Sequence, residues 1–262
     1  MKLTTISSCY IGPEISPEQF IPEHFFLYLI RGAINGYDGN KNYTLKPGEY
    51  CIARKNHLAR YNKQKDDDVF GKIVVIFDEA FLKVQKEKHK MHINKAAISG
   101  AFVAGGKNER IETFIKSLEP YYNGEGRLDG RYADIKREEL LLILLAINPE
   151  LANVFFDFAI PQKINIEAFM NSNYKFNVSL ERFAYLTGRS LSAFKRDFKQ
   201  VFNDTPSHWL IQKRLRESYF LISKKGKKPT DIYLDLGFED LSHFSFVFKK
   251  MFGVAPTALG KE

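Results

Sequence analysis

Apolar residues in the first third of the chain come in short runs that predict β-strands. The runs at 25–30, 50–53 and 73–77 have the length of ordinary strands. Asn35-Gly36 and Pro47-Gly48 are turn dipeptides that separate them. Short strands divided by tight turns predict an antiparallel barrel or sandwich for this part of the chain.

After about residue 108 the apolar spacing changes to that of helices. Ile111, Phe114, Ile115 and Leu118 fall on one helical face, and Pro120 ends the run. These positions predict an amphipathic helix that follows the strands.

A second helix is predicted over 129–147. Ile135, Leu142 and Leu145 are expected to line one of its sides, although 140–147 is apolar all round. A helix of that kind must be covered on several faces. The cover comes either from its own chain alone or also from a second subunit.

The last hundred residues contain one pattern twice. Residues 186–206 and 236–256 align without a gap at an offset of 50, and eight positions are identical. The identical pairs are Leu186 with Leu236, Leu191 with Leu241, Ser192 with Ser242, Phe194 with Phe244, Phe198 with Phe248, Lys199 with Lys249, Phe202 with Phe252 and Pro206 with Pro256. Self-similarity of this kind indicates one supersecondary unit built twice.

Each copy carries a phenylalanine stripe. Phe194, Phe198 and Phe202 recur at every fourth residue, as do positions 244, 248 and 252, so each set lies on one face of a helix. A buried stripe also fixes which side chains of that helix point outward.

Helix start and stop signals precede each stripe. Gly188 and Gly237 can end a preceding helix in the left-handed conformation. Ser190 and Asp240 stand where the next helix needs an N-cap. The shorter helical patterns before the glycines run over 180–186 and 232–236. Helix, glycine turn and capped helix is the layout of a helix-turn-helix unit.

The outward face of the first stripe helix is cationic. It holds Ser192, Lys195, Arg196 and Lys199. Arginine can grip O6 and N7 of guanine with two donors, and lysine can hold a base or a phosphate. The alternative is a solvated charged face of the kind most surface helices have.

The outward face of the second stripe helix differs. It offers Ser242, His243, Ser245 and Phe246, with Lys249 nearer the helix end. Serine discriminates bases weakly, and Phe246 can contact a thymine methyl group or pack against protein. We therefore expect the second unit to contribute less to specificity.

Residues 206–223 are predicted to form one helix between the copies. About 17 residues would give ~25 Å at the helical rise per residue. That length could hold two recognition helices near successive major-groove segments, which lie ~34 Å apart. The following segment, 224–229, is strongly basic and is either a phosphate contact or a flexible solvated loop.

Composition and charge narrow the functional class. The chain has 262 residues with 44% hydrophobic and 27% charged residues, as folded domains do. Residues 161–262 hold 17 Lys and Arg against 10 Asp and Glu, which is +7 of the chain's net +8. This asymmetry favours a polyanionic partner for the C-terminal part, with a basic surface kept for solubility as the alternative.

The N-terminal segment and the cysteines indicate a cytoplasmic protein. No apolar run follows Lys2, which argues against a secretory signal, and 140–147 is too short to span a bilayer. Cys9 and Cys51 are the two cysteines, a number that suits a reducing compartment.

These C-terminal residues resemble the AraC/XylS family of bacterial transcription regulators. The second copy carries the resemblance at 237–244 and 248–256. In the first copy it rests on Ser190, Phe194, Arg196, Phe198, Lys199, Thr205, Pro206 and Trp209. The likeness covers about 164–259 and implies two helix-turn-helix units joined by a linker helix.

The resemblance also assigns candidate base readers. In the first unit they are Ser192, Lys195 and Arg196. In the second unit they are Leu241, Ser242, Ser245 and Phe246. The complete predicted DNA-binding set adds the two N-caps, His243 and the two aligned lysines, namely Ser190, Asp240, His243, Lys199 and Lys249. Phe246 departs from the family, in which many members have arginine there, and the Tyr-Arg pair that often follows Pro256 is missing. Both departures predict weaker base reading by the second unit.

For the N-terminal part the resemblance is to the family's regulatory half, a cupin-like β-barrel followed by dimerising helices. It rests on the strand-turn pattern at 45–49 and on the order of the elements. The expected fold is thus α+β, with a regulatory and dimerisation domain at 1–160 and an all-α DNA-binding domain at 161–262. The implied partners are promoter DNA, RNA polymerase, a small-molecule or protein effector, and a second copy in a homodimer. Activation is the commoner function in the family, and neither a cofactor nor a membrane is expected.

A cupin-type metal enzyme or ligand-binding protein with an accessory nucleic-acid-binding domain is the rival hypothesis. Its N-terminal candidates are His24, His57, His89 and His92, but they contain no His-x-His pair. His89 and His92 have helical spacing in a lysine-rich segment, which favours two solvated side chains. An RNA-binding or architectural protein is a third class, disfavoured because the C-terminal aromatics have core spacing. We therefore predict a regulator that is not an enzyme.

Overall fold

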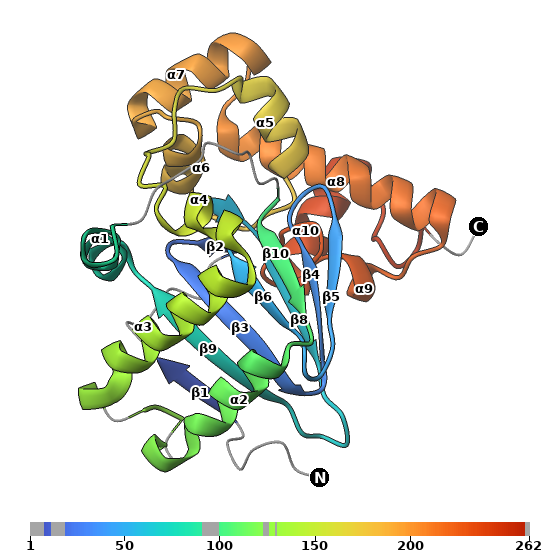
Figure 1. The fold of residues 1–262 in the computed structure, drawn as a ribbon. Helices are drawn as coiled ribbons and strands as arrows, with labels where there is room; N and C mark the ends of the chain where they lie inside the picture. The colour runs from blue at the N-terminus through green and yellow to red at the C-terminus, as the bar shows by residue number, and fades with distance from the viewer. Residues whose placement is uncertain (1–7, 12–18, 91–99, 123–125, 129, 260–262) are drawn as a thin grey trace. The chain divides into compact units, whose positions relative to one another are not determined.

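The computed structural model describes residues 8–11, 19–90, 100–122, 126–128 and 130–259 (Figure 1). The segment 1–7, His92 and Asp129 entered the sequence predictions and lie outside the described residues. The chain divides into two compact units, residues 1–159 and 160–262. The fold is α+β, with the strands in the first unit and helices alone among the described elements of the second.

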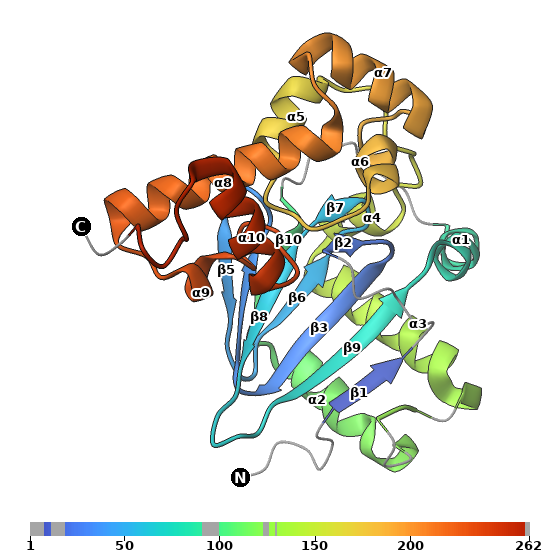
Figure 2. The same cartoon turned by 180° about the vertical axis from the view of Figure 1, so that it is seen from behind.

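The strands of the N-terminal unit form three sheets among the described residues (Figures 1 and 2). The strands are β1 (Ser8–Ile11), β2 (Phe20–Ile21), β3 (His24–Arg31), β4 (Ala33–Tyr37), β5 (Asn42–Leu45), β6 (Tyr50–Ala53), β7 (His57–Leu58), β8 (Arg60–Gln64), β9 (Gly71–Phe77) and β10 (Phe102–Gly106). The sheet orders are β1-β9-β3-β6-β10, β2-β7 and β5-β4-β8. β1 runs parallel to β9, whereas the other pairs are antiparallel.

The central strands of the five-stranded sheet are buried on both faces. Phe26 of β3 lies opposite Val75 of β9, and both side chains enter the core that the helices cover. The next pair, Leu27 and Val74, enters a second cluster shared with the three-stranded sheet. Because successive side chains of a strand point to opposite faces, β3 and β9 need apolar residues at nearly every position.

The predicted cupin-like barrel is not seen as a closed sheet in the described part of the chain. The three-stranded sheet contacts the five-stranded sheet through side chains around Ile34 and Leu45 rather than through a shared ladder. Gly32, with a φ of +91°, lies between β3 and β4, where the chain changes sheet. A Cβ there would lie 2.4 Å from the carbonyl oxygen of Gln64. The apolar runs at 25–30, 50–53 and 73–77 correspond to β3, β6 and β9. Asn35-Gly36, predicted as a turn, instead lies within β4, where both residues pair with β5.

Helices cover one face of the five-stranded sheet (Figure 1). The helices of this unit are α1 (Glu79–Lys88), α2 (Glu109–Ser117), α3 (Gly130–Ile147) and α4 (Ala152–Phe155), with 3-10 turns at Glu119–Tyr121 and Pro149–Leu151. Asn108 caps α2 by accepting hydrogen bonds from the backbone N–H groups of Arg110 and Ile111. The predicted α2 stripe is confirmed, because Ile111, Phe114, Ile115 and Leu118 are all buried.

The residues predicted to line one side of α3 do not form its buried face. Ile135 is 63% exposed and Leu142 is 37% exposed, whereas Leu140, Leu141 and Leu144 are buried. Leu145 is partly buried against the same core. The apolar residues of α3 therefore lie on two sides of the helix.

Arg137 belongs to the buried face of α3. Its side chain is buried, its Nε donates to the carbonyl of Ile76 at 2.8 Å, and its guanidinium pairs with Asp78. The guanidinium carbon also lies 4.0 Å from the centroid of the Phe81 ring. These tertiary partners allow a charged residue to take an inward position on the helix.

Cys9 and Cys51 are buried on opposite faces of the five-stranded sheet. Cys9 lies in the core under the helices, and Cys51 lies in the cluster toward the three-stranded sheet. Burial raises the pKa of Cys9 to about 11 and that of Cys51 to about 12. Both thiols are therefore protonated at neutral pH and are inert nucleophiles.

The described helices of the C-terminal unit pack around two aromatic cores. They are α5 (Ile166–Asn173), α6 (Leu180–Leu186), α7 (Leu191–Phe202), α8 (Pro206–Lys225), α9 (Pro229–Ile232) and α10 (Leu241–Phe252). Phe183, Phe194 and Phe198 are fully buried in the first half of the unit, and Phe244 and Phe248 in the second. None of the described helices of either unit is long and apolar enough to cross a bilayer.

Candidate nucleic-acid interface

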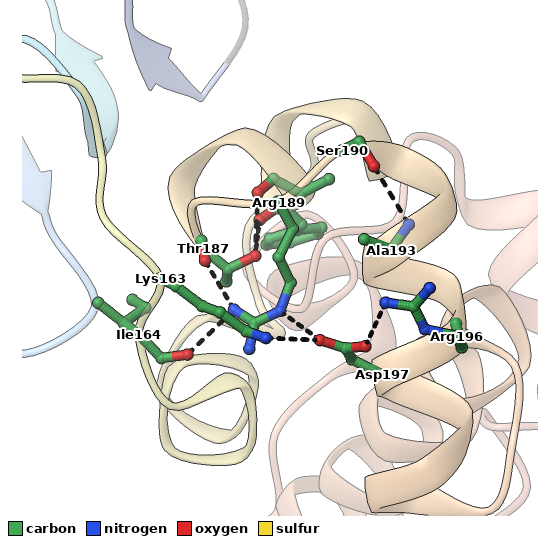
Figure 3. Close-up of polar contacts among 10 residues, drawn as sticks. Lys163, Ile164, Thr187, Arg189, Ser190, Ala193, Arg196 and Asp197 are labelled. Atoms are coloured by element: carbon green, nitrogen blue, oxygen red, sulfur yellow. Dashed lines mark hydrogen bonds and ion pairs between the residues drawn. The ribbon is translucent and has the colours of Figure 1, made fainter.

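The first stripe helix, α7, begins as its sequence predicts. Gly188 has a φ of +65°, and a Cβ there would lie 2.3 Å from the backbone carbon of Gln162. Ser190 is the N-cap, and its Oγ accepts a hydrogen bond from the N–H of Ala193 at 3.3 Å (Figure 3). A residue with a side chain at 188 would disturb both the turn and the segment that crosses it.

The phenylalanine stripe of α7 faces inward. Phe194 and Phe198 are fully buried. Phe202 is partly buried, and its ring centroid lies 4.6 Å from that of Trp209 on α8. The packing of these aromatic rings fixes how α7 is rotated about its own axis.

The residues that we predicted to contact DNA on α7 lie on the outside. Ser192, Lys195, Arg196 and Lys199 are exposed, and the cap Ser190 is exposed beside them. The three cations extend from one side of the helix, with Lys195 and Arg196 in its second turn and Lys199 in its last turn. Such a surface can approach phosphates and base edges without rearrangement of the core.

The second stripe helix, α10, repeats the arrangement with different chemistry outside. The carboxylate of Asp240 accepts a hydrogen bond from the N–H of His243 at 2.6 Å and caps the helix. Phe244 and Phe248 are fully buried, as their aligned partners on α7 are. Phe246 is 67% exposed, which is unusual for so large an apolar side chain.

The remaining predicted residues of α10 divide into two groups. Ser242, His243 and Lys249 are exposed. Leu241 and Ser245 are partly buried, and Leu241 packs against the core of the second half. Leu241 was predicted to be a base reader, but its packing leaves less of its side chain exposed to a partner than that role needs.

The helix before the second turn begins and ends earlier in the chain than predicted. The sequence pattern placed it over 232–236, but α9 covers Pro229–Ile232. Helical turns continue beyond it, because the N–H of Leu236 donates to the carbonyl of Ile232 at 3.0 Å. Gly237 then adopts a φ of +84°. The Pro at the start and the glycine turn leave room for only a short first helix in this unit.

The linker helix α8 is longer than predicted and contains a buried arginine that the sequence did not reveal. It includes Lys224 and Lys225 and ends at Gly226, whose φ is +60°. Its 20 residues correspond to ~30 Å. The basic segment predicted as a loop is therefore partly helical, and its lysines are exposed.

Arg214 of α8 links the segment between α5 and α6 to the turn of the second helix-turn-helix unit. Its Nε donates to the carbonyl of Tyr174, its Nη2 to that of Phe176, and its Nη1 to that of Gly237, each at 2.8 Å. Burial lowers the pKa of Arg214 to about 10, so the guanidinium remains charged at neutral pH. Because one rigid group holds backbone before α6 and at the turn before α10, it helps to fix how the two halves of the C-terminal unit are placed.

A second buried arginine stands at the turn of the first unit and was also missed. The Nε of Arg189 donates to the carboxylate of Asp197 on α7 at 3.1 Å, and its Nη1 donates to the carbonyls of Ile164 and Thr187 (Figure 3). The hydrogen bond from Arg189 helps to hold the pKa of Asp197 below its usual value. The one sequence feature that could have indicated this contact was Asp197, an acidic residue within the otherwise cationic surface of α7.

The histidines of the N-terminal unit do not form a metal site in the described residues. His24 is buried, and desolvation lowers its pKa to about 3, so it is neutral. His57 Nδ1 contacts the carbonyl of Lys55 at 2.8 Å, and His89 Nε2 contacts Glu138 at 2.8 Å. Within the described part of the chain, no three His, Cys, Asp or Glu side chains are placed to share a metal ion.

Two family models together span most of the chain. Residues 24–154 match the ExsA N-terminal regulatory domain, which is half of the chain, and residues 183–262 match a helix-turn-helix domain. The chain belongs to the AraC/XylS family of transcription regulators. An AraC/XylS regulator binds duplex DNA through its helix-turn-helix domain and is controlled through its N-terminal domain. Both parts are present here.

Similar proteins extend over different shares of this AraC/XylS regulator. The HTH-type transcriptional regulator ExsA of Pseudomonas aeruginosa is 22% identical over 260 residues, covering 96% of this chain and 91% of that protein. The virulence regulon transcriptional activator VirF of Yersinia enterocolitica is 29% identical over 126 residues, covering 46% of each. The crystal structure of an apo ToxT variant from Vibrio cholerae is 14% identical, with a TM-score of 0.44, and covers 96% of this chain and 93% of that chain.

Proposed function

We propose that this protein binds a promoter site in double-stranded DNA through α7 and α10 and thereby activates transcription. The observation on which this proposal depends is the duplicated helix, whose buried phenylalanines leave polar side chains exposed on its outer face. The part of the chain that contains both copies also holds most of the net positive charge. Membership of the AraC/XylS family and the similarity to named activators support the direction of control.

The proposed readout divides the predicted residues by chemistry. Arg196 contacts guanine with two donors, Lys195 and Ser192 contact neighbouring base edges, and Lys199 contacts a phosphate. The N-cap Ser190 lies where a helix N-terminus can meet a phosphate. All five of these residues are exposed, which supports the assignment.

The second helix has a smaller proposed share in sequence reading. Ser242, Ser245 and His243 contact backbone or base edges, and Phe246 contacts a thymine methyl group. Asp240 and Leu241 position the helix start, and Lys249 holds a phosphate. The exposure of Phe246 and the partial burial of Leu241 support the division.

The N-terminal part of the chain, residues 1–160, is proposed to be the regulatory and dimerisation domain. We infer a cupin-like arrangement in which the five-stranded and three-stranded sheets form an open sandwich rather than a closed barrel. The match to the ExsA regulatory domain supports control by a small-molecule or protein effector. Tyr132, Ile135 and Leu142 lie exposed on one side of α3, which supports a homodimer interface there.

The rest of the proposal follows from the same assignment. RNA polymerase is the partner through which an activator acts, and the protein works in the cytoplasm without a metal or cofactor. We propose no catalytic reaction, because the family membership accounts for both units as parts of a regulator.

Binding to three nucleic acids at matched salt tests the proposed function. We expect the full chain to bind duplex DNA with a sequence preference, and to bind single-stranded DNA and RNA more weakly and without one. Removing the cations of α7 (K195A/R196A/K199A) should abolish the preference. The control K224A/K225A removes charge at the end of α8 and should weaken all sequences alike. Equal binding of all three nucleic acids by the unmodified chain contradicts the proposal.

A further inference from the structure

Arg189 is an enclosed cation at the edge of the first recognition helix. Its side chain is 7% exposed. Its Nη1 donates to the carbonyl oxygens of Thr187 at 2.6 Å and Ile164 at 3.0 Å, which ties the helix-turn-helix turn to the segment before α5. The remaining hydrogen bond, from Nε, goes to Asp197. The guanidinium is thus fixed at three points.

Asp197 connects this buried arginine to the outer surface of α7 (Figure 3). Its Oδ2 accepts from Arg189 at 3.1 Å and lies 3.5 Å from the Nζ of Lys163. Its Oδ1 accepts from the Nη2 of Arg196 at 3.3 Å. The carboxylate is 16% exposed and Arg196 is 69% exposed, so the network runs from the interior to the proposed reading surface.

The pair between Asp197 and Arg196 would contribute little if it stood alone. Exposed ion pairs contribute little to stability, because both side chains are mobile and hydrated. Here the carboxylate does not move freely, since Arg189 holds its other oxygen. A fixed partner limits the rotamers that Arg196 populates before DNA arrives.

Restricting Arg196 matters because arginine has a large rotamer entropy. Ordering such a side chain at an interface costs conformational entropy, and ordering it beforehand reduces that cost. The reduction applies to a base contact that needs one orientation of the guanidinium, such as a bidentate grip on guanine. Among the described residues, Lys195 and Lys199 have no ion partner, so this restraint distinguishes Arg196 from the other cations of α7.

We propose that Arg189 and Asp197 are positioning residues for base recognition, which hold the guanidinium of Arg196 ready to read one guanine. The inference rests on the proposed function, because it requires that α7 reads duplex DNA. Neither residue needs to touch DNA. Their effect is confined to the base pair that Arg196 contacts.

The test uses the full chain and a duplex that it selects from a randomised library. R196A identifies the base pair at which discrimination depends on Arg196. D197N, which keeps the shape of the side chain but removes its charge, should lower discrimination at that base pair by about threefold to tenfold. Removing a negative charge near DNA also raises affinity for every sequence, so the ratio between cognate and substituted duplexes is the readout.

Three further variants separate positioning from general stability. R189K should reduce the same ratio, because lysine cannot hold the carboxylate and both carbonyls together. E217Q is the matched control, because it breaks the pair between Glu217 and Lys175, whose atoms lie 3.0 Å apart in the same unit. It should leave the ratio unchanged. In the R196A background D197N should have no further effect on the ratio, since the two residues act as one.

Two outcomes overturn the inference. One is an unchanged ratio in D197N, which decides the matter even if R189K unfolds in thermal measurements. The other is an equal loss of ratio from D197N with and without Arg196, which would indicate a merely structural role. Either leaves the proposed function standing. If the unmodified chain selects no duplex at all, the proposed function itself fails, and the inference fails with it.

Discussion

The two halves of the C-terminal unit have the same interior and different exteriors. α7 and α10 bury the same phenylalanine positions and start with a capping side chain at the same register. Outside, α7 presents lysine and arginine where α10 presents serine and an exposed phenylalanine. The comparison teaches that the repeat preserves the scaffold of a recognition helix, while the chemistry of reading is free to change on its surface.

The shared interior should give matched stability effects, the largest that we expect. F198A and F248A each remove a fully buried ring and should each lower the free energy of unfolding by about 3–5 kcal/mol. Urea unfolding followed by circular dichroism measures both. V201A, at an exposed position of α7, is the control and should stay within about 0.5 kcal/mol. A normal stability for either phenylalanine variant would mean that the facing of that helix is wrong.

Arg214 tests whether the two halves depend on one another. R214A leaves three buried carbonyl groups without their donor and should lower stability by about 2–4 kcal/mol. Hydrogen exchange should show faster opening both at 174–176 and at the Gly237 turn, because the arginine donates to backbone carbonyls at each. R216A, the exposed neighbour on α8, should have little effect. The account is contradicted if the two variants behave alike.

The different exteriors should appear as unequal base reading. R196A should cost about 1–3 kcal/mol on a selected duplex and flatten the preference at one base pair. F246A should cost less, on the order of 1 kcal/mol or below, because it loses only an apolar contact with a methyl group. Titrations against single-base-substituted duplexes measure both effects. A larger loss from F246A would reverse the proposed ranking of the two units.

The aligned lysines should give the smallest and most similar effects. Lys199 and Lys249 occupy equivalent positions of the repeat, and both are exposed. Each alanine variant should weaken binding to all sequences evenly and reduce the slope of log K against log salt by about one unit. A slope that does not change would remove that lysine from the interface.

Much of the C-terminal unit was predictable, because its signals are local. The stripe of Phe194 and Phe198, the cap at Ser190 and the turn at Gly188 are all encoded within 15 residues of each other. The structure places them as predicted. Their spacing follows the helical period, which sequence displays directly.

The parts that could not be predicted depend on contacts between distant residues. Arg189 reaches back to Ile164, and Arg214 reaches both Tyr174 and Gly237. Periodicity carries no information on such pairs. The same reason explains α3, where buried Arg137 found partners on strand and turn, and explains why the way the two sheets meet was not foreseen.

Methylation protection on the selected duplex tests the central claim most directly, because it reports N7 of guanine in the major groove. We predict protection in two segments about one helical turn apart. In the segment assigned to α7, R196A should remove the protection of a single guanine. Protection confined to one segment, or none at all despite tight binding, would contradict an account in which both copies of the repeat enter the major groove.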